Sequence, residues 1–197
     1  VAAGVDHVFG VVGSGNFHVT NAMVAAGARF VAARHEGGGA TMADAYARTS
    51  GRPAALSVHQ GCGLTNAMTG IGEAAKSRTP LIVLAAEATN RASNFFVDQD
   101  ALARSVGAVP LRITDPQYAV TQVREAVATA VHQRRTVVLN LPLEVLAAEV
   151  PAGPSPGGVP SQVQDPPDFL PPEPPRPLEP SGSDVARLVS ALRSAQR

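Results

Sequence analysis

The alternation of short apolar runs with longer helical segments is the feature that most constrains the fold of this chain. Six runs rich in Val, Leu, Ile and Ala predict β-strands at residues 8–12, 29–34, 54–59, 80–87, 111–114 and 136–141. The segments between them predict helices at 16–26, 37–50, 65–77 and 117–133. Strands that are apolar on both faces and alternate with helices form sheets covered on two sides. We therefore predict an α/β fold, a doubly wound and mostly parallel six-stranded sheet with helices on both faces.

Helix-ending and helix-packing residues fit the same pattern. Gly27 and Gly51 follow two of the predicted helices, at positions where glycine commonly ends a helix. The fourth predicted helix carries valines three and four residues apart, which predicts one apolar face: Val120, Val123, Val127 and Val131.

The composition changes abruptly at residue 151 and divides the chain into three parts. Twelve of the 17 prolines lie between residues 151 and 180, which predicts an extended, semi-rigid linker over 151–182. A domain is expected at 1–150. Residues 183–197 predict the first helix of a central domain otherwise absent, with Ser183 or Asp184 as N-cap and an apolar stripe of Val185, Leu188, Val189 and Leu192. The chain opens without Met, as if within a helix that ends at Gly4, and we expect a fragment of a longer protein.

Charge and cysteine content exclude several classes of function. Sixteen basic and sixteen acidic side chains cancel, so nothing favours nucleic acid or an anionic membrane surface. No apolar run reaches the roughly 18 residues of a membrane span. The single cysteine, Cys62, cannot form a disulfide within the chain, and we expect the reducing cytoplasm as its compartment. The five histidines are not spaced as metal ligands, so no metal site is predicted.

Three loops are expected at the carboxyl edge of the sheet, where such folds bind ligands. The first contains Gly13 and Gly15 after a strand, but the third glycine of a dinucleotide-binding motif is missing. Glu36 lies near the place where that motif has an acidic residue. This loop is therefore either a tight strand–helix turn or a nucleotide phosphate site.

The second loop places Glu36 at a strand end, before three glycines that lower helix stability. The glycines leave room for a planar ligand beside the carboxylate; alternatively, Glu36 caps its own helix. His35 is expected to face away as a strand residue. In the third loop, Thr65 or Asn66 is expected to begin a helix, and Cys62 is either a small apolar wall or a nucleophile beside His59.

The stretches VFGVVG, RHEGGGATMADAYAR, SVHQGCGLTNAMTGI and PLIVLAAE occur in this order. Together they resemble the N-terminal pyrimidine-binding domain of thiamine diphosphate-dependent enzymes of the acetolactate synthase-like branch, over about residues 4–150. The resemblance implies that Glu36 hydrogen-bonds to the aminopyrimidine and activates the cofactor for attack on a carbonyl group, commonly of a 2-oxo acid. By the same resemblance, the pyrimidine pocket is lined by Val12, Gly13, His59, Gly61, Cys62 and Asn66. Gln99 falls near a position that faces substrate in several relatives.

The chain departs from the family pattern around the expected reaction space. Val12 and Cys62 stand where the family usually has Pro, Gly37 where it often has Gln, and His59 and Gln60 where it has Thr and Ser. The substrate is therefore open, and so is the choice between a carboligase and a 2-oxo acid decarboxylase.

The resemblance also implies partners. The family holds the diphosphate and Mg²⁺ in a separate domain with a GDG motif, which this chain lacks, so another subunit or chain is expected to supply that domain. By the same resemblance we expect a homodimer or homotetramer, and we expect this fragment alone to be inactive. The resemblance leaves open whether the enzyme also binds FAD. Two alternatives remain: a non-catalytic structural or regulatory relative of the same fold, and a Rossmann-type nucleotide-binding domain.

Overall fold

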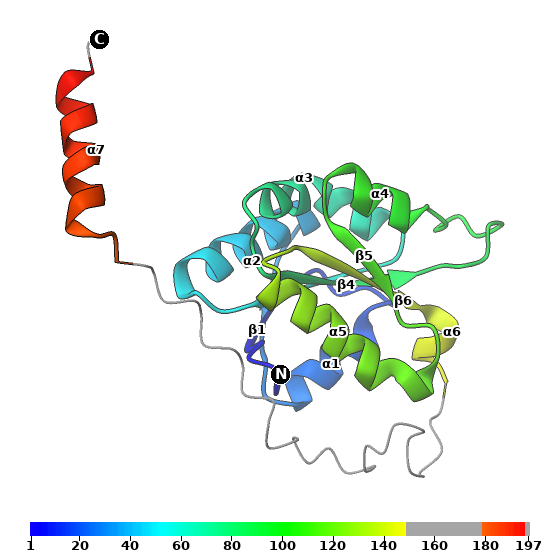
Figure 1. Ribbon diagram of the computed structural model, residues 1–197. Coiled ribbons are helices and arrows are strands. Elements are labelled where there is room, and N and C mark those ends of the chain that lie inside the picture. The colour runs from blue at the N-terminus through cyan, green and yellow to red at the C-terminus, as the bar shows by residue number, and fades with distance from the viewer. Residues whose placement is uncertain (149–178, 196–197) are drawn as a thin grey trace.

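A computed structural model describes residues 1–148 and 179–195 and contains a six-stranded parallel sheet (Figure 1). The strands are β1 (His7–Gly10), β2 (Arg29–Ala32), β3 (Ala54–Val58), β4 (Leu81–Glu87), β5 (Val109–Arg112) and β6 (Val137–Pro142). Their order is β2-β1-β3-β4-β6-β5, and every neighbouring pair is parallel. The predicted doubly wound sheet is confirmed.

Helices cover both faces of this sheet (Figure 1). One face carries α2 (Glu36–Ser50), α3 (Cys62–Lys76) and α4 (Gln99–Ser105), which share an apolar core with the sheet. The other face carries α1 (Phe17–Ala25) and α5 (Ala119–His132), which share a second core. A short 3₁₀ helix (Pro116–Tyr118) precedes α5, and α6 (Leu143–Leu146) follows β6. The sheet therefore separates two apolar layers, as the alternating sequence pattern predicts.

Burial along the strands follows their place in the sheet. The central strands β3, β4 and β6 are buried throughout, whereas the edge strands β2 and β5 are partly exposed. The strand predicted over 8–12 ends at Gly10, and Val12 is 47% exposed. The apolar face predicted for α5 is only partly buried: Val127 is buried, but Val120 and Val123 are exposed. Val123 lies against an apolar hollow of about 240 Å³ between α1, α5 and the sheet.

Several boundaries differ from the sequence prediction. α3 begins at Cys62 with Gly61 as its N-cap, rather than at Thr65 or Asn66. α4 and α6 were not predicted, because four to seven residues are too few to show helical periodicity. α7 (Gly182–Ser194) confirms a helix near the end of the chain, but its N-cap is Ser181, and none of its residues is buried. Most of the predicted linker lies outside the described residues.

Small side chains bring α2 and α3 into close contact. Gly39, Ala40 and Ala43 of α2 are buried, and so are Ala67 and Gly70 of α3. A side-chain carbon on Gly70 would lie only 2.5 Å from the Cβ of Ala40. The two helices therefore pack almost backbone to backbone, and their first residues meet at the same edge of the sheet.

The strand order also gathers the three loops that the sequence singles out. β2, β1 and β3 are neighbours, so the loops that follow them emerge side by side at the carboxyl edge. The chain winds from β1 to β2 in one direction and then crosses to β3 on the other side of β1. Open α/β sheets bind their ligands at such a reversal of strand order.

Candidate functional site

Hydrogen bonds to Asn16 and His59 hold the glycine loop after β1 in place. The backbone N–H of Gly13 donates to Asn16 Oδ1 at 2.7 Å, and the N–H of Gly15 donates to His59 Nδ1 at 3.1 Å. Asn16 is completely buried and donates in turn to the carbonyl of Val11 and the hydroxyl of Ser57. A phosphate site needs backbone amides that point at the ligand. Two amides of this loop are instead used within the protein, which favours the tight turn over the phosphate site.

Glu36 is the first residue of α2, but it does not cap that helix. The N-cap is His35, which has extended backbone, lies beyond the end of β2 and accepts a hydrogen bond from the Gly37 amide through Nδ1. The Glu36 carboxylate turns to α3, where its Oε2 accepts a hydrogen bond from Asn66 Nδ2 at 3.0 Å. The expectation that His35 is a strand residue is therefore wrong. His35, and not Glu36, caps α2.

Open space lies next to the Glu36 carboxylate. Within the described part of the chain, no side chain or backbone group hydrogen-bonds to Glu36 Oε1. A side-chain carbon at Gly63 would lie 3.6 Å from this oxygen, so the glycine keeps that side of Oε1 free of a side chain. One carboxylate oxygen is thus fixed by Asn66, while the other lies beside Gly63. This arrangement fits a flat ring that carries a nitrogen able to share a proton.

His59 lies at the end of β3, between the first and third loops. Its Nδ1 accepts the Gly15 amide, and its ring packs edge-on against Phe95 with the ring centroids 5.2 Å apart. Burial lowers the pKa of His59, and the nearby Glu36 carboxylate opposes this shift. The imidazole is therefore held in a fixed orientation, and its neutral form is favoured at pH 7.

The turn into α3 requires glycine at one position. Gly61 has φ +62° and ψ −100°, and a side-chain carbon there would lie 2.3 Å from the Phe95 carbonyl oxygen. The next residue, Cys62, is exposed, and among the described residues its thiol has no hydrogen bond to His59. The geometry therefore gives no support to a Cys62 nucleophile. Gln60 is buried beside this turn, and its Oε1 has no hydrogen-bond partner in the described structure.

Comparisons with known proteins identify the family. Residues 1–106 match the family described as thiamine pyrophosphate enzyme, N-terminal TPP binding domain. The chain is 34% identical over 157 residues to the probable 2-ketoarginine decarboxylase of Pseudomonas aeruginosa. The aligned stretch covers 75% of this chain and 28% of that protein. The chain belongs to the thiamine pyrophosphate enzyme family.

Other members of the thiamine pyrophosphate enzyme family are similar over comparable stretches. A sulfoacetaldehyde acetyltransferase of Rhodobacter capsulatus is 31% identical over 158 residues, covering 76% of this chain and 27% of that protein. A solved structure described as a thiamin diphosphate-dependent enzyme from Mycobacterium smegmatis superposes with a TM-score of 0.64 and 23% identity, over 72% of this chain and 28% of the other. This likeness supports the fold. The chain spans 27–28% of the length of these curated relatives.

The structure brings most of the predicted site residues to one edge of this thiamine pyrophosphate enzyme domain. Gly13, His59 and Glu36 surround the same space, with Asn66 behind the carboxylate. Val12 is an exposed residue of the first loop. Sequence reasoning missed Asn16, which fixes the glycine loop; an Asn three residues after a glycine at a strand–helix junction is the local signal that points to it.

Gln99 is placed differently from an open substrate-facing residue. It is 2% exposed, and its Nε2 donates to Asn140 Oδ1 at 2.8 Å. Its Oε1 accepts a long hydrogen bond, 3.4 Å, from the Gly61 amide. Gln99 therefore links the turn into α3 with the end of β6, and its contact with substrate stays a prediction.

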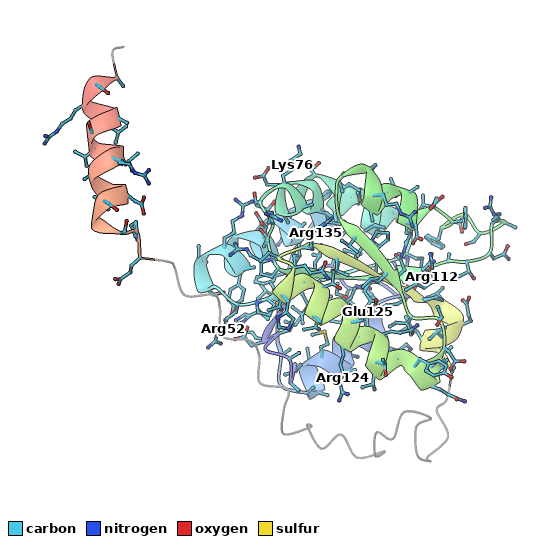
Figure 2. All side chains as sticks on the ribbon, viewed as in Figure 1. Arg52, Lys76, Arg112, Arg124, Glu125 and Arg135 are labelled. Atoms are coloured by element: carbon cyan, nitrogen blue, oxygen red, sulfur yellow. The ribbon has the colours of Figure 1, made fainter. Side chains whose placement is uncertain are left out.

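A charged cluster continues from Gln99 toward the edge strand β5. Asn140 donates to Asp100, and Arg112 binds Glu87 through two hydrogen bonds of 2.7 Å and also reaches Asp100 at 3.0 Å. The Glu87 carboxylate, chiefly, raises the pKa of Arg112 further above its ordinary value. Figure 2 shows Arg112 at the end of the sheet opposite to Arg52. The cluster ties α4, β4, β5 and β6 together and so supports the turn at Gly61.

Neither a metal-binding cluster nor a membrane-spanning helix occurs among the described residues. No group of three or more His, Cys, Asp or Glu side chains within 1–148 and 179–195 could hold a metal ion. No helix in the same ranges is long and apolar enough to cross a membrane. The apolar hollow between α1 and α5 is lined by aliphatic side chains, which offer no group for binding or catalysis of the kind found at the carboxyl edge.

Proposed function

We propose that this chain is the pyrimidine-binding part of a thiamine diphosphate-dependent transferase or lyase that acts on a 2-oxo acid or a related carbonyl compound. The observation that carries the proposal is the Glu36 carboxylate, with one oxygen held by Asn66 and the other beside Gly63 without a hydrogen-bond partner among the described residues. Membership of the family supports the cofactor. Names of relatives such as a decarboxylase and an acetyltransferase support the substrate class.

Glu36 is the catalytic residue of the proposal. Because Asn66 fixes Oε2, the carboxylate cannot rotate freely, and Oε1 keeps one direction. Oε1 then holds or releases a proton at a ring nitrogen of the aminopyrimidine. Thiamine diphosphate, when bound, supplies a carbon nucleophile and an electron sink for carbonyl chemistry.

The remaining residues shape the pocket. Gly13 makes room for the His59 ring and Gly61 for the Phe95 backbone, and we propose that Val12, Gly13, His59, Gly61 and Cys62 line the pyrimidine pocket beside Glu36. The side chains at this edge leave it open to solvent: Cys62 and Asn66 are exposed and Glu36 is half-buried. We propose that a diphosphate-binding domain of another subunit covers this open side and brings Mg²⁺ with it.

The experiment compares two Glu→Gln variants in the assembled enzyme, that is, this chain together with its diphosphate-binding domain. Glu36→Gln keeps the shape of the side chain but removes its ability to exchange a proton. Glu125→Gln is the matched control, because Glu125 is an exposed residue on α5, on the opposite face of the sheet (Figure 2). Turnover is measured with pyruvate, 2-oxobutyrate and 2-oxoglutarate.

Glu36→Gln should lower kcat at least about a hundredfold, the usual contribution of a positioned acid–base group, whereas Glu125→Gln should match the wild type. Turnover of Glu36→Gln near the wild-type rate would show that Glu36 is not the activating group. A wild-type enzyme that converts none of the three acids would contradict the 2-oxo acid as substrate.

A further inference from the structure

The orientation of His59 fixes which of its nitrogens carries a proton. A backbone N–H can only donate, and the Gly15 amide donates to Nδ1 at 3.1 Å. Nδ1 must therefore keep its lone pair free to accept. In a neutral imidazole the proton then lies on Nε2, which makes that nitrogen a hydrogen-bond donor.

The surroundings hold the ring in this state. A side-chain carbon at Gly13 would lie 2.9 Å from the ring carbon Cγ, and one at Gly63 would lie 3.0 Å from the His59 Cβ. The Phe95 ring closes another side, at 77° to the imidazole plane. Neither glycine nor Phe95 carries a charge, and Glu36 on α2 is the charged group that acts on His59. Close contacts at Gly13 and Phe95, together with the Gly15 hydrogen bond, therefore favour one orientation of the imidazole.

The Nε2–H group has no hydrogen-bond partner in the part of the chain that the structure describes. Among the described residues, His59 makes one hydrogen bond, and that bond uses Nδ1. The other side chains of the site are poorer hydrogen-bond donors to a ligand: Val12 has no polar atom, the Cys62 thiol is a weak donor, and Asn66 already donates to Glu36. His59 is thus the strong donor left free beside the Glu36 carboxylate.

We propose that His59 contacts the substrate, and that its Nε2–H donates a hydrogen bond to a carbonyl or carboxylate oxygen of a 2-oxo acid. This inference rests on the proposed function for its substrate class. Oxygen atoms of such acids are acceptors, which matches a fixed neutral donor. A neutral donor also leaves the negative charge of Glu36 uncompensated and available for its own proton.

The tautomer is tested on the chain itself by NMR. The 197-residue chain is labelled with ¹⁵N-histidine, and long-range ¹H–¹⁵N correlations are recorded from pH 5 to 8, with His59→Gln to assign the signal. We expect an unprotonated Nδ1 and a protonated Nε2 at pH 7, with a pKa below the ordinary value of 6.5. A proton on Nδ1 at pH 7 would overturn the inference whatever the enzyme does.

The contact is tested in the assembled enzyme with two amide variants. The amide nitrogen of Gln reaches about as far from the backbone as Nε2, whereas that of Asn reaches only as far as Nδ1. With the 2-oxo acid that the wild type converts fastest, the kcat/KM of His59→Asn should lie about tenfold or more below that of His59→Gln, which is the effect of one lost hydrogen bond.

The two proposals fail in different ways. Equal kcat/KM for His59→Asn and His59→Gln would overturn the role of His59, even if Glu36→Gln abolishes turnover. Turnover that survives Glu36→Gln would overturn the proposed function instead. A wild type that converts none of the three acids would contradict the 2-oxo acid as substrate, and with it the proposed contact of His59.

Discussion

Two glycines on neighbouring helices should respond in opposite ways to the same substitution. Gly38 lies in the first turn of α2, where an added methyl group would meet no atom within 4 Å. Gly70 lies in the middle of α3, where the new carbon would lie 2.5 Å from the Cβ of Ala40. Because both changes are Gly→Ala in a helix, their difference isolates the packing between α2 and α3.

The magnitude follows from two opposing effects. Alanine gains up to about 1 kcal/mol of helix stability over glycine at either position. Carbon atoms pack best at roughly 3.5–4.0 Å, so Gly70→Ala must push the helices apart by about 1 Å. Overpacking of this kind costs about 1–3 kcal/mol. Gly38→Ala should therefore be more stable than Gly70→Ala by about 1–3 kcal/mol, or about 2–12 °C in Tm for a chain of this size.

Urea and thermal unfolding followed by circular dichroism measure the difference. Gly38→Ala should unfold at or above the wild-type midpoint, and Gly70→Ala should unfold below Gly38→Ala by the stated amount. Equal stability of the two variants would refute the close α2–α3 packing, and with it the reason that Glu36 meets Asn66.

The ion pairs at the two ends of the sheet provide further tests. Arg112→Met should lower the free energy of unfolding by about 2 kcal/mol, less than for a fully buried pair because the guanidinium is 37% exposed; a urea midpoint like that of the wild type would contradict this. Burial raises the pKa of Asp6, but hydrogen bonds from His7, Tyr46 and Arg52 outweigh it and lower the pKa to about 2. Stability contributed by Asp6 above about pH 4 should therefore be lost as the pH falls toward 2. Asp6→Asn should flatten this part of the urea-midpoint profile, and an unchanged profile would assign the acid sensitivity to other groups.

Local pattern is sufficient for most of the fold but not for its details. Each apolar run that predicts a strand gives one, because the period of the pattern depends only on the neighbouring residues. The strand predicted over 8–12 ends at Gly10, which is the last residue of β1 to pair with β2 and β3 and has φ +154°. The apolar face of α5 is predicted from its valines, but its burial depends on which other elements cover that side of the sheet.

The site is predictable to the extent that its signals are local. Glu36 is marked by the three glycines after it, and the structure places it at the expected edge. Its partner Asn66 comes from another helix, 30 residues away, and only the α2–α3 packing brings the two together. Gln99 shows the opposite case, because its buried hydrogen bonds join segments up to 41 residues apart that no local pattern connects.

The central claim is that Glu36 activates the bound aminopyrimidine, and the most direct measurement is the exchange of the C2 proton of thiamine diphosphate. The assembled enzyme is mixed with D₂O, quenched in acid at set times, and analysed by ¹H NMR. Glu36→Gln should slow the exchange at least about a hundredfold, and Asn66→Ala should slow it less, because the carboxylate remains but is no longer fixed. Exchange in Glu36→Gln at the wild-type rate would contradict the account.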